Sequence, residues 1–174
     1  VLLCIGAELP RELPVPGREL AGVHPAMEFL SQQNRRVAGD AVDPASEISA
    51  AGKHVIVLGG GDTGSDCVGT SHRQGARSVT SIELLPRPPE GRHPAEPWPV
   101  AMRMTYNVSS SHAEGGERES ALLTKGLVGR EGQAIALQLE GEAQPQGRER
   151  VLVLDEARNF YTFVNVDVEP VPSL

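Results

Sequence analysis

The stretch that most constrains the fold is residues 54–64. Residues 54–58 (HVIVL) form a short run rich in β-branched residues, which is typical of a strand buried in a parallel sheet. Residues 59–64 (GGGDTG) follow at once and fit the pattern G-x-G-x-x-G. The pattern beyond predicts a helix over 62–74 and a second strand over 78–84. Strand, glycine turn, helix and strand within about 30 residues form the βαβ unit of a dinucleotide-binding fold.

The glycines of this turn have separate physical roles. Gly59 permits a tight turn, Gly61 lets a pyrophosphate approach because it has no Cβ, and Gly64 allows the helix to pack closely on the strand. The N–H groups at the helix start carry partial positive charge and face the phosphates. The charge of Asp62 suits the helix dipole but not the phosphates, so we expect this side chain to bond backbone or cofactor hydroxyls. The predicted cofactor contacts at the turn are Gly59, Gly60, Gly61, Asp62, Thr63 and Gly64.

The pattern alone leaves the ligand open. Glycine makes up 19 of the 174 residues, so a match to G-x-G-x-x-G arises easily by chance. Its position between a strand and a helix is what favours a dinucleotide. The other interpretations are a glycine-rich turn with no ligand and a site for a single adenosyl group, as in methyltransferases.

Two charged residues after the second strand give opposite indications about the cofactor. Glu83 lies about 20 residues beyond the glycines, where the fingerprint places an acid that binds the ribose hydroxyls of NAD(H). Arg87 follows it closely and could instead hold the 2′-phosphate of NADP(H). Glu83 could also be a solvated acid at a strand end. The sequence therefore predicts NADH or NADPH without deciding between them.

The composition argues against several classes of partner. Lys and Arg number 16 against 23 Asp and Glu, a formal net charge of −7, whereas nucleic acids and anionic membranes attract a concentrated positive face. No apolar run approaches the roughly 18 residues of a membrane-spanning helix. Two cysteines, Cys4 and Cys67, make neither a disulfide framework nor a metal-ligand cluster. We therefore expect no nucleic acid, membrane or metal partner, and a reducing, cytoplasmic setting.

The chain is expected to be a fragment of a longer protein. Val1–Ala7 is a continuous apolar run, typical of a buried strand, with nothing upstream to complete its sheet. A stretch rich in proline and glycine follows it, and Pro25 begins a predicted helix that ends near Gly39. We divide the chain into a stub and linker at 1–24, a nucleotide-binding domain at 25–154 and an unassigned tail at 155–174.

The second half of the chain has a strand-like pattern. Residues 122–128 and 134–139 read as a hairpin joined by a glycine-containing turn, and residues 150–154 could add a strand. The tail beyond them, aromatic near Phe160, is expected to pack loosely or to be disordered.

Several short segments of the sequence resemble segments of the small or beta subunit of glutamate synthase, and they occur in the same order as in that family. They cover about residues 1–140 and include Pro16–Leu20 (PGREL), Gly59–Cys67 (GGGDTGSDC), Ile82–Glu90 (IELLPRPPE) and Ser110–Gly115 (SSHAEG). In that family an FAD domain of adrenodoxin-reductase-like type is interrupted by an NAD(P)H-binding domain. The resemblance thus implies an α/β Rossmann-like domain with a parallel sheet, an antiparallel β-meander covering one edge of it, and a larger two-domain flavoprotein around it.

The resemblance also implies an activity and partners. NAD(P)H passes a hydride to FAD, and electrons then cross iron–sulfur clusters to FMN on the large subunit, where glutamine and 2-oxoglutarate yield glutamate. The partners are that large subunit or domain and the FAD domain missing from this chain, so we expect no turnover by this part alone. Some members that strongly prefer NADPH carry an aromatic residue and two arginines at the end of the second strand. This chain has Glu83, Leu84 and Leu85 at those positions, which favours NADH.

No side chain of this chain is predicted to be catalytic, because hydride transfer belongs to the two cofactors. His112 and Glu114 follow three serines and are read as part of a polar loop. Two alternatives remain: the NAD(P)H-binding domain of another iron–sulfur flavoprotein reductase, such as dihydropyrimidine dehydrogenase, and a non-catalytic truncated remnant.

Overall fold

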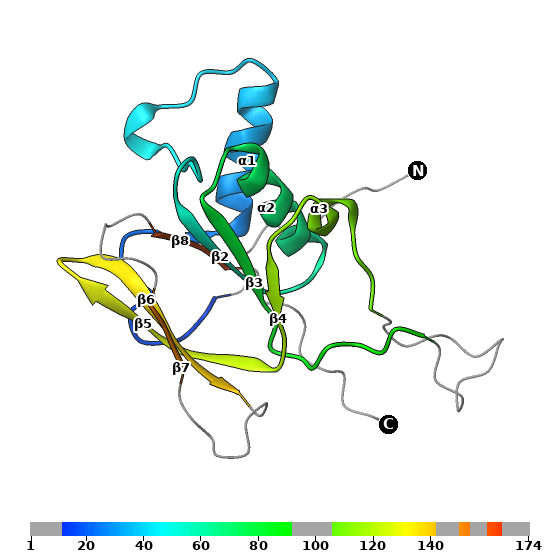
Figure 1. Ribbon diagram of the computed structural model, residues 1–174. Coiled ribbons are helices and arrows are strands. Elements are labelled where there is room, and N and C mark those ends of the chain that lie inside the picture. Colours follow the sequence, from blue (N-terminus) through cyan, green and yellow to red (C-terminus); the bar gives the residue numbers. More distant parts are fainter. Residues whose placement is uncertain (1–11, 92–105, 142–149, 154–159, 165–174) are drawn as a thin grey trace, which may run out of the picture.

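The computed structural model describes residues 12–91, 106–141, 150–153 and 160–164 (Figure 1). The strand expected at Val1–Ala7 lies outside these residues. Within them the chain forms a layer of helices, a parallel sheet and a smaller antiparallel sheet. The α/β fold class expected from the sequence is confirmed.

The central layer is a five-stranded sheet in which all neighbouring strands are parallel. Across the sheet, the strands are β1 (Val23–Pro25), β8 (Phe160–Val164), β2 (His54–Leu58), β3 (Ser78–Ile82) and β4 (Glu117–Glu119). β2 and β3 are the two strands that the apolar runs predict. Because parallel strands end at the same edge of a sheet, the segments that follow β2 and β3 lie close together, which is where ligands bind in such folds.

The expectation that the tail packs loosely or is disordered is wrong for residues 160–164. They form β8, which pairs with both β1 and β2 inside the sheet. Thr162 stands opposite Val23 on one side and Ile56 on the other. Aromatic and β-branched residues suit a strand, but β2 lies far away in the sequence, so no local pattern indicates this pairing.

Two helices cover one face of the parallel sheet (Figure 1). The helix α1 (Ala26–Val37) begins directly after Pro25, and α2 (Asp62–Arg73) begins at the glycine turn, both close to their predicted bounds. Gly75, just past the end of α2, has a φ of +82° that stops the helix. Two shorter helical segments are the 3-10 helix η1 (Pro44–Ser46) and the one-turn helix α3 (Ser110–Ala113).

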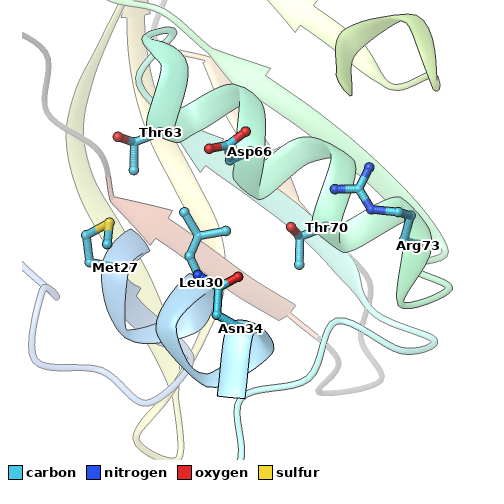
Figure 2. A pocket seen from close by; sticks show the side chains of 7 residues that line it. All are labelled: Met27, Leu30, Asn34, Thr63, Asp66, Thr70 and Arg73. Atoms are coloured by element: carbon cyan, nitrogen blue, oxygen red, sulfur yellow. The ribbon is translucent and has the colours of Figure 1, made fainter. Parts of the chain in front are cut away.

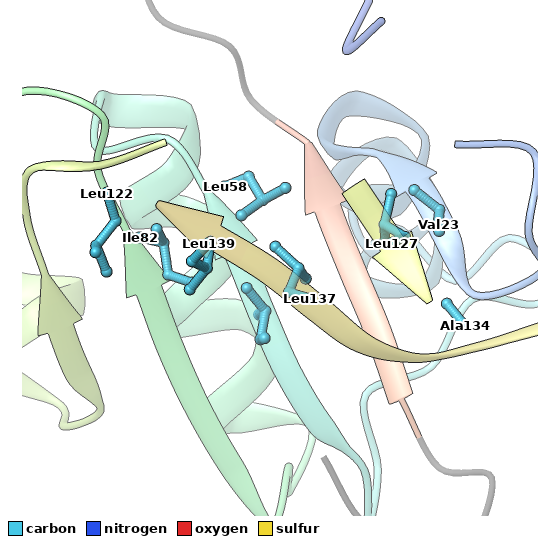
Figure 3. Close-up of a cluster of buried hydrophobic side chains, with 9 residues drawn as sticks. Val23, Leu58, Ile82, Leu122, Leu127, Ala134, Leu137 and Leu139 are labelled. Carbon is cyan, nitrogen blue, oxygen red and sulfur yellow. The ribbon is translucent and has the colours of Figure 1, made fainter. Parts of the chain in front are cut away.

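The antiparallel sheet contains β5 (Leu122–Arg130), β6 (Gln133–Gly141) and β7 (Arg150–Val153). β5 and β6 form the predicted hairpin, closed by Glu131 and Gly132 at φ values of +52° and +80°. This antiparallel sheet packs on the face of the parallel sheet that lies opposite the helices. The expectation that it covers one edge of the parallel sheet is wrong. Figure 3 shows the shared core, whose buried members are Val23, Ile56, Leu58, Ile82, Leu122, Leu127, Ala134, Leu137 and Leu139.

The strand β2 explains why its sequence is apolar without alternation. Val55 and Val57 pack in the cluster under the helices, whereas Ile56 and Leu58 pack in the cluster under the antiparallel sheet. All four are 5% exposed or less. A strand covered on both faces needs apolar side chains in both directions. Among the described residues, no helix has the length and apolar character needed to cross a bilayer.

Candidate functional site

The glycine turn lies between the end of β2 and the start of α2. Gly59 has a φ of +112°, a conformation that favours glycine, and its N–H donates to the Ile82 carbonyl oxygen over 2.8 Å. A Cβ added at Gly64 would clash with the Gly59 carbonyl oxygen. These two glycines therefore let the chain leave the strand sharply and bring the first turn of the helix against it.

The start of α2 presents backbone donors. Gly61 is the N-cap residue, with φ −72° and ψ −178°, and as a glycine it offers no side-chain acceptor. The first intrahelical bond runs from the Ser65 N–H to the Gly61 carbonyl oxygen over 2.9 Å. The N–H groups of Asp62, Thr63 and Gly64 precede it and lie at the positive end of the helix dipole. This arrangement suits an anionic group such as a phosphate.

Glu83, directly after β3, lies against the same turn. A Cβ added at Gly60 would be 2.5 Å from each of the Glu83 carboxylate oxygens. The Glu83 side chain is only 14% exposed, so it is not the solvated strand-end acid that the sequence left open. A side chain at position 60 would therefore clash with the Glu83 carboxylate, which favours glycine there whatever ligand the turn holds.

Arg118 on β4 is the ion-pair partner of Glu83. Its Nη2 is 2.8 Å from Glu83 Oε1, and its own side chain is 18% exposed. Its Nη1 donates to the Asn107 carbonyl oxygen over 3.0 Å. Its guanidinium carbon also lies 4.9 Å from the centre of the Tyr106 ring. Three contacts therefore hold this arginine in place beside the acid.

Arg87 joins the same group of side chains through Tyr106. Its guanidinium carbon is 3.9 Å from the ring centre, and its Nη2 is 3.0 Å from Glu90 Oε1. Both members of that ion pair are more than half exposed. The structure thus brings the two residues that gave opposite indications, Glu83 and Arg87, to one cluster, linked by Tyr106 and Arg118. Neither of the linking residues was predicted.

A third polar group packs against the first turns of α2. Nδ1 of His112, on α3, is 2.9 Å from the hydroxyl oxygens of both Ser65 and Ser109, and Ser109 donates to Ser65 over 3.2 Å. Burial lowers the pKa of His112, the Arg118 charge lowers it further, and Glu83 opposes this. The imidazole is therefore neutral at pH 7.

The polar loop expected around His112 is instead the helix α3, docked on α2. Ser109 caps this helix by accepting from the His112 N–H over 3.3 Å. Glu114, just beyond the helix, pairs with Arg73 of α2. A sequence rich in serine gave no sign of this docking, since its partners on α2 lie far away in the chain.

A groove of about 340 Å³ lies between α1 and α2, and Glu83 is not among the residues that line it (Figure 2). Its lining residues are Met27, Leu30, Asn34, Thr63, Asp66, Thr70 and Arg73. Thr63 is the one predicted site residue among them. Within the described part of the chain, no group of three or more His, Cys, Asp or Glu side chains could hold a metal ion.

No family model matches the chain, but several proteins are similar to it. It is 52% identical over 140 residues to the NADPH-linked glutamate synthase small chain of Mycobacterium tuberculosis, a match that covers 79% of this chain and 28% of the relative. It is 39% identical over 178 residues to the NADH-linked glutamate synthase of Schizosaccharomyces pombe, covering 97% of this chain and 8% of the relative. The similarity therefore continues beyond residue 140, where the resembling segments found in the sequence end.

Solved structures show the same fold. The chain superimposes on an FAD-dependent pyridine nucleotide-disulphide oxidoreductase from Desulfovibrio vulgaris with a TM-score of 0.55, at 13% identity, over 90% of this chain and 33% of that one. This chain thus spans less than a third of either glutamate synthase relative. It is a homologue of part of the glutamate synthase small chain, and its fold is that of the pyridine nucleotide-disulphide oxidoreductases.

Proposed function

We propose that the chain binds NAD(P)H at the glycine turn and forms the NAD(P)H-binding part of a glutamate synthase electron-input subunit. The observation that carries this proposal is the start of α2, where the N–H groups of Asp62, Thr63 and Gly64 precede the first intrahelical bond. Such a helix start favours the diphosphate of a dinucleotide. The identity to glutamate synthases whose names specify NADPH or NADH supports the same class of ligand.

The residues around the turn fit this ligand. Glu83 lies against Gly60 of the glycine turn, and in dinucleotide-binding folds an acid after the second strand binds the ribose. Arg118 engages Oε1 of Glu83, and Oε2 would accept a hydrogen bond from a ribose hydroxyl. Arg87 is the candidate for the 2′-phosphate, since its guanidinium reaches Tyr106 in the same cluster.

The chain's contribution to the reaction is binding and orientation. Bound NAD(P)H supplies the hydride. The amides at the start of α2 hold the diphosphate, and Glu83 holds the ribose. Together these two contacts orient the rest of the bound cofactor. No side chain of this chain is assigned a proton transfer.

The remaining steps belong to parts beyond this chain. FAD would be held mainly by the other domain of the same polypeptide and would accept the hydride. Electrons would then reach the large subunit or domain for reductive synthesis of glutamate from glutamine and 2-oxoglutarate, in the cytoplasm. The 28% coverage of the mycobacterial relative leaves ample chain for that second domain.

Calorimetric titration of NADH and NADPH into the purified chain tests the proposal. Gly61→Val should weaken binding of both nucleotides at least about tenfold, because the new side chain occupies the diphosphate position. Gly61 has a negative φ, so this substitution does not strain the backbone. The matched control is Gly91→Val, since a Cβ at Gly91 has no atom within 4 Å. Failure of both nucleotides to bind at millimolar concentration, or unchanged affinity in Gly61→Val, would refute the site.

A further inference from the structure

We propose that Arg118 determines how strongly the chain discriminates between NADH and NADPH, by neutralising Glu83 beside the ribose site. The proposal rests on the proposed function and adds a residue outside the glycine fingerprint. Arg118 comes from β4, at the edge of the parallel sheet, and lies 35 positions beyond Glu83 in the sequence.

The starting observation is the environment of the Glu83 carboxylate. It lies against Gly60 of the glycine turn, and its Oε1 is 2.8 Å from Arg118 Nη2. Both side chains are more than four-fifths buried. Solvent therefore screens this pair less than a surface pair, and each charge acts strongly on whatever binds next to it.

NADH and NADPH differ only at the 2′ position of the adenosine ribose. An unpaired carboxylate at this place accepts a hydrogen bond from the 2′-hydroxyl and repels a 2′-phosphate. Here a guanidinium offsets that repulsion and brings a cation to the same place, because guanidinium groups bind carboxylates and phosphates alike. The balance between Glu83 and Arg118 then decides which cofactor is favoured.

Contacts other than the one with Glu83 also hold the Arg118 side chain in place. Its Nη1 donates to the Asn107 carbonyl oxygen over 3.0 Å, and its guanidinium lies near the Tyr106 ring. Arg118 thus keeps contacts besides Glu83, and it stays near the ribose site when Glu83 turns to a ligand. Arg87 contacts the same ring but pairs with the exposed Glu90. We therefore assign the larger effect to the buried arginine.

The test compares the ratio of the dissociation constants of NADPH and NADH across variants of the full chain. We expect the unmodified chain to bind both within about tenfold. Glu83→Gln should lower the ratio, in favour of NADPH, at least about tenfold, because Arg118 then faces the 2′ position without a competing charge. Arg118→Met should raise the ratio by a similar factor, since Glu83 is left uncompensated.

Arg118→Met could unfold the chain, because it leaves a buried carboxylate unpaired. The double variant Glu83→Gln/Arg118→Met avoids this, and its comparison with Glu83→Gln isolates the arginine: removing Arg118 should raise the ratio about tenfold in that background as well. Arg130→Met, an exposed residue at the end of β5, is the charge-matched control and should leave the ratio unchanged.

The outcomes separate this proposal from the one before it. A ratio that changes less than about threefold when Arg118 is removed from the Glu83→Gln background overturns the role of Arg118 while leaving the binding site intact. A larger effect of Arg87→Met than of Arg118→Met on the ratio also overturns it. If the unmodified chain binds neither nucleotide, the proposed function fails, and this inference fails with it.

Discussion

Replacement of Gly60 by alanine tests the packing of Glu83 on the glycine turn. The added Cβ would lie 2.5 Å from both carboxylate oxygens, so the carboxylate must move away. A flexible carboxylate could do so at little cost, but this one is held by Arg118 at 2.8 Å. Gly60→Ala should therefore cost about the 1.5–3 kcal/mol of a hydrogen bond to a charged group, reduced by about 0.4–1 kcal/mol because alanine restricts the unfolded chain.

We thus expect Gly60→Ala to lower the free energy of unfolding by about 0.5–2.6 kcal/mol in urea denaturation followed by circular dichroism. Gly91→Ala, where the Cβ meets open space, is the matched control and should change stability by less than about 0.5 kcal/mol. In the Glu83→Ala background the obstacle is gone, and Gly60→Ala should cost nothing further. Additivity of the two substitutions to within about 0.5 kcal/mol would refute the geometry.

Three further predictions concern other parts of the chain. Burial and the nearby Asp66 raise the pKa of Cys67 to about 12, so its thiol should resist iodoacetamide at pH 8 until urea is added; peptide mass spectrometry showing modification of Cys67 itself in the folded chain would contradict this. The lowered pKa of His112 means that the unfolded state binds its proton at higher pH, so this residue supports folding above about pH 6.5 and costs stability below it. His112→Gln should therefore lose less stability than the unmodified chain between pH 7.5 and 5.5, and urea curves with the same pH dependence would count against the buried imidazole. Leu137 is fully buried between the two sheets, so Leu137→Ala should lower the free energy of unfolding by about 2–5 kcal/mol, and a loss below 1 kcal/mol would show that the sheets do not pack as described.

The βαβ unit could be predicted because its signals are local. The apolar run of β2 is followed directly by the glycines, and the helices cover that strand on one face while the antiparallel sheet covers it on the other. The spacing to Glu83 likewise follows from the lengths of one helix, one turn and one strand, α2 to β3. Each of these features depends on neighbouring residues, so a single sequence contains enough information to indicate them.

The features that were missed depend on distant residues. β8 pairs with β1 and β2, and a short aromatic and β-branched segment does not indicate its partners. Arg118 lies in the polar strand β4, where an arginine usually reads as solvated, and only the parallel pairing of β4 with β3 brings it beside Glu83. The docking of His112 on Ser65 has the same origin. To predict that a charged residue such as Arg118 is buried, one would need to know which strands are neighbours in the sheet.

The central claim is that backbone amides at the start of α2 bind the diphosphate of NAD(P)H. The most direct measurement is a ¹H–¹⁵N NMR titration of the 18.5 kDa chain with ADP-ribose, which carries the diphosphate and the adenosine without the nicotinamide. The account predicts that the amide signals of Asp62, Thr63 and Gly64 show the largest shifts, and that Gly61→Val abolishes them. Saturable binding that leaves these three amides unmoved would contradict it.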